Sequence, residues 1–168
     1  RLIGFGYYAG LVGAYNGLRM YGLKEELFVL PKAEDLPDLD AMKAELDHVH
    51  LPGIRIVLTG SGKVMRGAKE ILDYIMVREV SVSDYLNLTF DEAVYTVADV
   101  DNYNLPPEGK NFDRSQFYAD PTGYRANFMP LARKSDFFIA GHFYGDGAPF
   151  LFSREDARDP NFSIKYVA

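Results

Sequence analysis

The sequence contains no cysteine. Disulfide bonds, zinc–thiolate sites, iron–sulfur clusters and thiol catalysis all require that residue, so each of them is excluded. A chain without disulfides suits a reducing compartment, and we therefore expect a cytoplasmic protein.

An excess of positive charge is also absent. The 168 residues include 18 Lys and Arg against 24 Asp and Glu, which gives a net charge of −6. Proteins that bind nucleic acid neutralise phosphates with clustered basic side chains, so this charge balance argues against a nucleic-acid partner. With 48% apolar and 25% charged residues, the composition is typical of a globular domain and favours an enzyme acting on small molecules.

Long hydrophobic runs are few. The most apolar stretch, residues 2–23, is long enough for a transmembrane helix, but it contains Asn16, Arg19 and several glycines. These residues favour a helix buried inside the protein, and we expect no membrane partner. Glycine disfavours a helix by about 1 kcal/mol per position relative to alanine. A helix so rich in glycine is therefore expected to pack closely against another backbone.

Both ends of the sequence resemble cuts through a longer protein. The chain begins at Arg1 without a methionine, and it ends in an alternating pattern, residues 163–168, that is typical of a strand. We therefore expect the sequence to be a fragment of a longer protein.

Strands and helices alternate along the chain. Helical spacing predicts helices at residues 7–21, 39–50, 63–74 and 124–134, and apolar runs predict strands at residues 54–59, 77–82, 93–100, 136–143 and 164–168. This alternation is typical of a parallel sheet covered by helices. We predict an α/β fold of the Rossmann-like, doubly wound type, with a mainly parallel sheet and helices on both faces.

The clearest functional pattern is a glycine turn between a predicted strand and a predicted helix. Residues 56–68 read IVLTGSGKVMRGA, in which Gly60 and Gly62 follow the strand directly. Gly60 would permit a tight turn, and Gly62 lacks the Cβ atom that would keep a diphosphate away from the backbone. The helix start offers free N–H groups and a partial positive charge. The pattern predicts a dinucleotide site at Thr59, Gly60, Ser61, Gly62, Lys63 and Val64.

The pattern departs from the usual dinucleotide motif at its third glycine. Met65 occupies that position, and Gly67 comes two residues later. Either the helix and the strand lie further apart than usual, or Gly67 and Ala68 supply the close contact. A phosphate loop of the nucleotide-triphosphatase type is excluded, because Val57 and Val64 replace the glycine and the Ser or Thr that it needs.

The end of the second predicted strand bears on the choice of cofactor. Rossmann-like domains that bind NAD place an acid there for the ribose 2′-hydroxyl, about 20 residues after the glycines. Here the position falls on Ser81, with Arg78 and Ser83 nearby. These residues could bind a 2′-phosphate, which makes NADP a candidate, whereas Asp84 keeps NAD open. The alternative is that the serines only begin a turn.

The exit of the fourth predicted strand is expected at the same edge of the sheet as the glycine turn. Gly141 would permit close approach of the cofactor, and Phe143 follows it. His142 is a candidate general acid or base, but the sequence shows no partner for it, so we expect it to form a wall of the pocket. His48 and His50 lie at a polar helix end without carboxylate support, which indicates surface rather than a metal site.

Several segments carry a resemblance to a known family. They are residues 60–68 (GSGKVMRGA), 79–82 (EVSV), 118–128 (YADPTGYRANF), 137–144 (FFIAGHFY) and 149–157 (PFLFSREDA). Together they resemble the nucleotide-binding domain of the lysine-2-oxoglutarate reductase/saccharopine dehydrogenase family, a relative of alanine dehydrogenase and transhydrogenase. The last three segments are the most specific, since a generic dinucleotide domain would not contain them.

The resemblance implies a two-domain enzyme with a cleft between its substrate and cofactor domains. It implies NAD or NADP as cofactor and oxidoreductase chemistry on a CH–NH bond, in which an amino acid and an oxo acid form an imine that takes hydride, or the reverse. The family's acid–base residues lie mainly on the other domain, so no catalytic residue is carried over. Its cofactor contacts match residues 59–64, Ser81 and residues 141–143.

Residues 1–50 are then expected to form an interdomain helix and a connector helix, and residues 51–168 an NAD(P)-binding domain whose substrate domain is missing. Two alternatives stay open: an alanine-dehydrogenase-like oxidative deaminase, and a non-catalytic nucleotide-binding or assembly module. The glycine-rich first helix supports an interface role, either with the substrate domain or in a homodimer.

Overall fold

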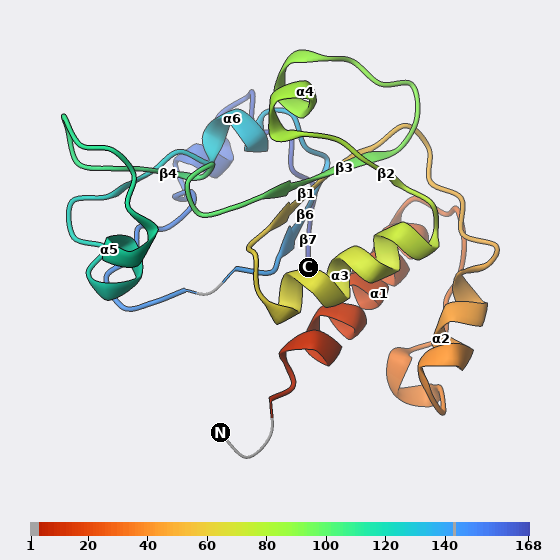
Figure 1. The fold of residues 1–168 in the computed structure, drawn as a ribbon. Coiled ribbons are helices and arrows are strands. Elements are labelled where there is room, and N and C mark those ends of the chain that lie inside the picture. The colour runs from red at the N-terminus through yellow and green to blue at the C-terminus, as the bar shows by residue number, and fades with distance from the viewer. Residues whose placement is uncertain (1–3, 143) are drawn as a thin grey trace.

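A five-stranded parallel sheet forms the centre of the protein (Figure 1). The computed structural model describes residues 4–142 and 144–168. The strands are β1 (Arg55–Thr59), β2 (Arg78–Glu79), β3 (Val94–Ala98), β6 (Phe137–Ala140) and β7 (Tyr166–Val167). Hydrogen bonds order them as β2-β3-β1-β6-β7, and every neighbouring pair is parallel.

Helices cover both faces of the sheet. They are α1 (Gly6–Lys24), α2 (Leu39–Leu46), α3 (Lys63–Tyr74), α4 (Val82–Asn87), α5 (Arg114–Ala119) and α6 (Met129–Ala132), with short 3₁₀ helices η1 (Ala33–Asp35) and η2 (Asp156–Arg158). α1, α2 and α3 pack on one face, and α4 and α6 pack on the other. The predicted Rossmann-like α/β fold is confirmed. A small antiparallel pair, β4 (Asn104–Leu105) with β5 (Arg125–Ala126), follows the carboxyl end of β3.

Side chains that alternate along the strands build a core on each face. In β1, Ile56 and Leu58 join the core under α1 and α3, whereas Val57 joins the core under α4 and α6. All three side chains are fully buried. Full burial of one such side chain contributes about 1.5–3 kcal/mol. A strand buried on both faces must be apolar at every position, which explains the uninterrupted run at residues 56–58.

The strand order places the third strand along the chain, not the second, beside β1. β2 lies at the edge of the sheet, with β3 between it and β1. β3 is buried along most of its length, whereas both residues of β2 are exposed. The chain leaves the edge at Ser81, whose hydroxyl oxygen accepts a hydrogen bond from the Asp84 N–H at 3.0 Å and caps α4. The strand predicted at residues 77–82 is therefore shorter, and a helix begins where a connector was expected.

The helix predicted at residues 124–134 is divided in the structure. Its first part forms β5, and only Met129–Ala132 is helical. Pro130 lies in the first turn of α6, the one part of a helix in which proline loses no backbone hydrogen bond. The predicted helix therefore extends too far toward the N-terminus, because Pro130 marks a helix start.

Helices α1 and α3 lie side by side and approach each other backbone to backbone (Figure 1). A Cβ atom added at Gly10 would overlap the main-chain carbonyl of Val64, and one added at Gly67 would overlap that of Tyr7. The close packing expected of the glycine-rich first helix is present, and α3 is its partner. α1 and α2 share one buried core with α3. Among the described residues, no helix combines the length and the apolar character that crossing a membrane requires.

We predict that Gly10→Ala destabilises the fold by about 1–3 kcal/mol, because the added methyl group would force α1 and α3 apart. Gly13→Ala is the matched control on the same helix, since nothing lies within 4 Å of the position of its added Cβ. At that position alanine should stabilise the protein by up to about 1 kcal/mol. Urea unfolding measures both effects, and equal stability of the two variants would contradict the close packing.

Candidate functional site

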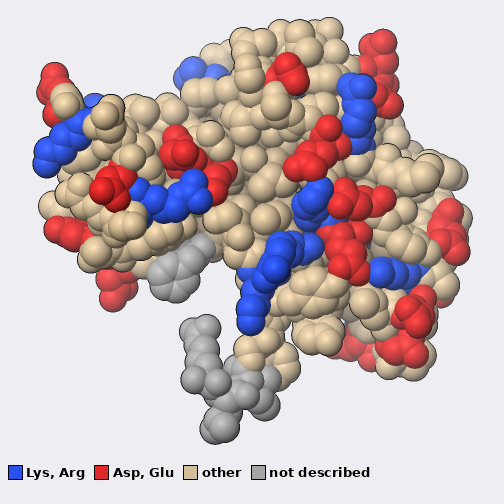
Figure 2. Space-filling model, viewed as in Figure 1, with Lys and Arg blue, Asp and Glu red and all other residues tan. Residues whose placement is uncertain are grey.

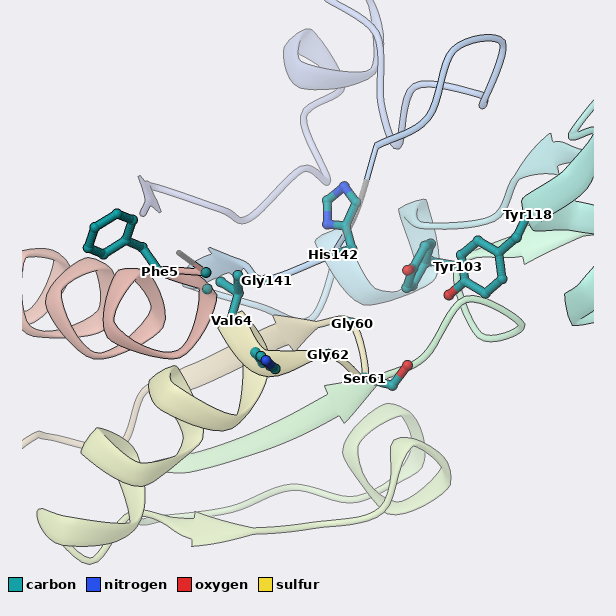
Figure 3. Close-up of a pocket in the computed structure, with 12 residues that line it drawn as sticks. Phe5, Gly60, Ser61, Gly62, Val64, Tyr103, Tyr118, Gly141 and His142 are labelled. Atoms are coloured by element: carbon teal, nitrogen blue, oxygen red, sulfur yellow. The ribbon is translucent and has the colours of Figure 1, made fainter. Parts of the chain in front are cut away.

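A cleft of about 870 Å³ opens at the carboxyl edge of the sheet, where β1 and β6 lie side by side (Figure 3). The chain leaves β1 toward α3 and β2 on one side, and β7 lies beyond β6 on the other. Ligands of open α/β sheets bind at such a reversal of strand order. Of the residues predicted from the sequence, the structure brings these to the cleft: Gly60, Ser61, Gly62, Lys63, Val64, Gly141 and His142.

The two glycines of the turn differ in their surroundings. Gly60 has a φ of +105°, and an added Cβ would lie 2.6 Å from the carbonyl oxygen of Gly141. Its N–H donates a hydrogen bond to the carbonyl of Ala98 at 2.9 Å, which ties the turn to β3. Gly62 has nothing within 4 Å of an added Cβ. Gly60 therefore lets the ends of β1 and β6 meet, while the absence of a side chain at Gly62 keeps the helix start open.

The missing third glycine of the motif is compensated from the opposite strand. An added Cβ at Gly141 would lie 3.1 Å from the Cα of Met65, so the small residue stands on β6's exit rather than on the helix. Gly67 makes its close contact with α1 instead of the sheet. The helix and the sheet therefore approach each other closely, but Gly141 allows this contact, not Gly67. Gly67 packs against α1.

The start of α3 has the features of an anion site. Its N-cap is Gly62, which offers no side chain to the N–H groups of the first turn, and that turn contains no acid. Of the described residues that line the cleft, Lys63 is the one with a charged side chain. The helix dipole contributes about half a positive charge at the same point. On the face shown in Figure 2, acidic and basic side chains are otherwise interspersed.

His142 is held by Thr59, the last residue of β1. The hydroxyl of Thr59 lies 2.7 Å from Nδ1 of His142, and Thr59 itself is fully buried, so it supports the cleft rather than lining it. The imidazole stacks on Phe138 with ring centroids 6.4 Å apart. Burial lowers the pKa of His142, which keeps the ring neutral at physiological pH. A neutral imidazole that is hydrogen-bonded to a hydroxyl suits the predicted role of His142 as a residue that forms the wall of the pocket. Phe143, predicted beside it, lies outside the described residues.

Ser81 does not reach the cleft. Because β3 lies between β2 and β1, the strand that ends beside the glycine turn is β3, and the first residue after it is Asp99. The Asp99 carboxylate accepts a hydrogen bond from the Val100 N–H at 2.7 Å and pairs with Arg114 of α5 at 2.7 Å. An acid therefore follows the strand that lies beside β1, whereas Ser81 follows the strand at the edge of the sheet.

Five lining residues were not predicted from the sequence: Gly4, Phe5, Gly6, Tyr103 and Tyr118. Tyr103 and Tyr118 lie next to each other, across the cleft from Phe5 (Figure 3). Phe5 and Gly6 belong to the start of α1, which was expected at an interface rather than at the pocket. No local pattern marks Tyr103, because it lies in an irregular connection whose path only the completed fold determines.

Within the part of the chain that the structure describes, no group of three or more His, Asp or Glu residues lies close enough together to hold a metal ion. No protein-family model matches the chain, and no curated protein is significantly similar to it. The chemistry of the cleft must therefore be inferred from its own residues.

We predict that His142 contributes a pH dependence to stability. Its pKa is lowered in the folded state, so below about pH 6.5 the unfolded chain binds more protons than the folded one. Stability should therefore fall with decreasing pH from that point until the folded imidazole also takes its proton. In His142→Asn, which keeps an acceptor for Thr59, this component should disappear from urea unfolding measured across the range. An NMR titration in which the His142 ring titrates at or above its ordinary value would contradict the prediction.

Proposed function

We propose that this chain binds NAD or NADP and serves as the cofactor domain of an amino-acid oxidoreductase that acts on CH–NH bonds, of the saccharopine dehydrogenase type. The observation that carries the proposal is the open space at Gly62, at the start of α3 and beside the junction of β1 and β6. A parallel sheet, a glycine turn and an uncapped helix start at its carboxyl edge are the arrangement that dinucleotides use.

The residues present fit such a cofactor. The diphosphate would lie against the main chain at Gly62, Lys63 and Val64, in the space that a Cβ at Gly62 would fill. Asp99 is not among the residues that line the cleft, but it directly follows β3, the strand beside β1, and would accept a hydrogen bond from the adenosine ribose at the edge of the site. His142, which lines the cleft, would bound the other half of the molecule. When bound, the nicotinamide ring supplies hydride transfer.

The resemblance supports the rest of the proposal. It favours a small amino acid or oxo acid as substrate and a cytoplasmic enzyme. The acid–base groups would come from a substrate-binding domain, since His142 is neutral and bonded to Thr59 rather than to a carboxylate. The full-length protein, assayed with lysine plus 2-oxoglutarate and separately with pyruvate plus ammonia, would distinguish the saccharopine type from the alanine dehydrogenase type.

A non-catalytic nucleotide-binding or assembly module is the second candidate. The observation that favours it is an exposed apolar stripe at the start of α1, formed by Phe5 (67% exposed), Tyr8 (61%) and Val12 (40%). Such a stripe suits contact with another protein surface. The two candidates differ in outcome: cofactor binding without turnover by the full-length protein with any amino acid would support the module.

The first test is Gly62→Ala. Its added methyl group enters open space, so the fold should be unaffected, while the methyl group blocks the diphosphate from the helix start. We expect the Kd for NADH and NADPH, measured by fluorescence titration, to rise by about tenfold or more, equivalent to at least about 1.4 kcal/mol. Gly13→Ala, also in open space but on α1, is the control and should bind as the wild type does. Unchanged binding by Gly62→Ala would refute the proposed site.

The second test concerns the choice between NAD and NADP. The carboxylate of Asp99 should repel a 2′-phosphate and accept the free ribose hydroxyl, so we expect the wild type to prefer NADH. Asp99→Ser should shift the ratio of the two Kd values toward NADPH by about tenfold or more, because it also removes the closer of the two carboxylates that pair with Arg114, the other being Asp101 at 3.7 Å. Ser81→Ala is the control: it removes the cap of α4, at a cost of about 1 kcal/mol, and should leave the ratio unchanged. If Ser81→Ala shifts the ratio and Asp99→Ser does not, Ser81 is the residue that selects between NADH and NADPH.

A further inference from the structure

Tyr103 is a buried tyrosine whose hydroxyl reaches the cleft. Only 4% of the residue is exposed, and it is among the residues that line the cleft (Figure 3). Its carbonyl accepts a hydrogen bond from the Asn127 N–H at 2.8 Å, and its ring lies 5.6 Å from the imidazole of His142. The backbone hydrogen bond to Asn127 and the contact with the His142 ring therefore hold Tyr103 in place.

The hydroxyl of Tyr103 has no hydrogen-bond partner among the described residues. Tyr15, Tyr85 and Tyr124 are buried as well, and each forms a hydrogen bond of 2.7–3.0 Å within the protein. Tyr21 shares the lack of a partner among the described residues, but it does not line the cleft. Burial raises the pKa of Tyr103, so the group is a protonated phenol at neutral pH. It can donate a hydrogen bond to an anion, and the cleft that Tyr103 lines offers room for such an acceptor.

The cleft faces two helix starts rather than one. α1 and α3 run in the same direction, and an added Cβ at Gly6 would lie 3.3 Å from the Cβ of Lys63, so their first turns are adjacent. Neither helix has a side-chain cap or an acid in its first turn. The positive ends of both helix dipoles therefore meet at the cleft that the Tyr103 hydroxyl enters.

We infer that Tyr103 is a diphosphate-binding residue, whose phenol O–H donates a hydrogen bond to a phosphate oxygen of a ligand held at the paired starts of α1 and α3. The inference rests on the proposed function in so far as the diphosphate is that of NAD(P). Its chemistry is more general, because ADP or inorganic pyrophosphate offers the same acceptor oxygens.

The test is Tyr103→Phe, which removes only the hydroxyl. A hydrogen bond to a charged group is worth about a factor of ten or more in affinity, so Kd for NADH and for ADP should rise by about that factor. No hydrogen bond between described residues is lost, so the unfolding midpoint should not fall. Tyr85→Phe is the matched control: it removes the 2.7 Å bond to Ser135, and should lower the unfolding midpoint while leaving Kd unchanged.

Calorimetric titrations of the wild type and both variants with NADH, ADP and inorganic pyrophosphate separate the outcomes. If Tyr103→Phe binds ADP and pyrophosphate as tightly as the wild type does, or loses stability as Tyr85→Phe does, the inference is overturned. A wild type that binds ADP or pyrophosphate but neither NADH nor NADPH overturns the proposed function, and the loss in Tyr103→Phe would still support the diphosphate role. A wild type that binds none of these ligands overturns both.

Discussion

The site depends on contacts between main chains, made where side chains are missing. The ends of β1 and β6 meet because Gly60 and Gly141 both lack a Cβ, and α1 lies against α3 because Gly10 and Gly67 do. Protein interiors are packed so densely that one added carbon at such a point displaces a whole element. The spacing between the backbones of β1, β6, α1 and α3 therefore determines the shape of the cleft.

The chemistry of the cleft is that of a binding site. Its lining combines free backbone N–H groups, one lysine, two tyrosines and a neutral imidazole. These groups donate hydrogen bonds or carry positive charge, and none of them is a carboxylate. Asp99, which follows β3, is paired with Arg114. Such a set of groups is suited to an anionic ligand, as the proposed function requires.

Local patterns predicted the parts of the fold that local physics determines. The buried strand at β1, the helix α3 and the glycine turn between them followed from residues 54–74, because burial on two faces and helix capping leave direct traces in sequence. The order of the strands did not follow, since β2 and β3 are both plausible neighbours of β1 by composition. That choice depends on long-range pairing, and it places Asp99, rather than Ser81, after the strand that lies beside β1.

The residues that line the cleft also fall into two groups, those that local sequence patterns predict and those that depend on the tertiary structure. Gly60 to Val64 and Gly141 to His142 adjoin strand ends, so the chain itself places them at the carboxyl edge. Tyr103, Tyr118 and Phe5 reach the cleft from three distant segments, and no spacing rule connects those segments. Residues whose role depends on the meeting of separate loops become visible only once the tertiary structure is known.

The glycine content of α1 has a consequence for the order of folding. A helix with so many glycines has little stability in isolation, and its contacts with α3 join residues far apart in the chain, such as Gly10 and Val64. α1 should therefore acquire its structure late, on a surface that the sheet and α3 have already formed. The first turn of α1 borders the cleft. A ligand that binds there would therefore stabilise the folded form of α1, so that ligand binding and the folding of this helix are coupled.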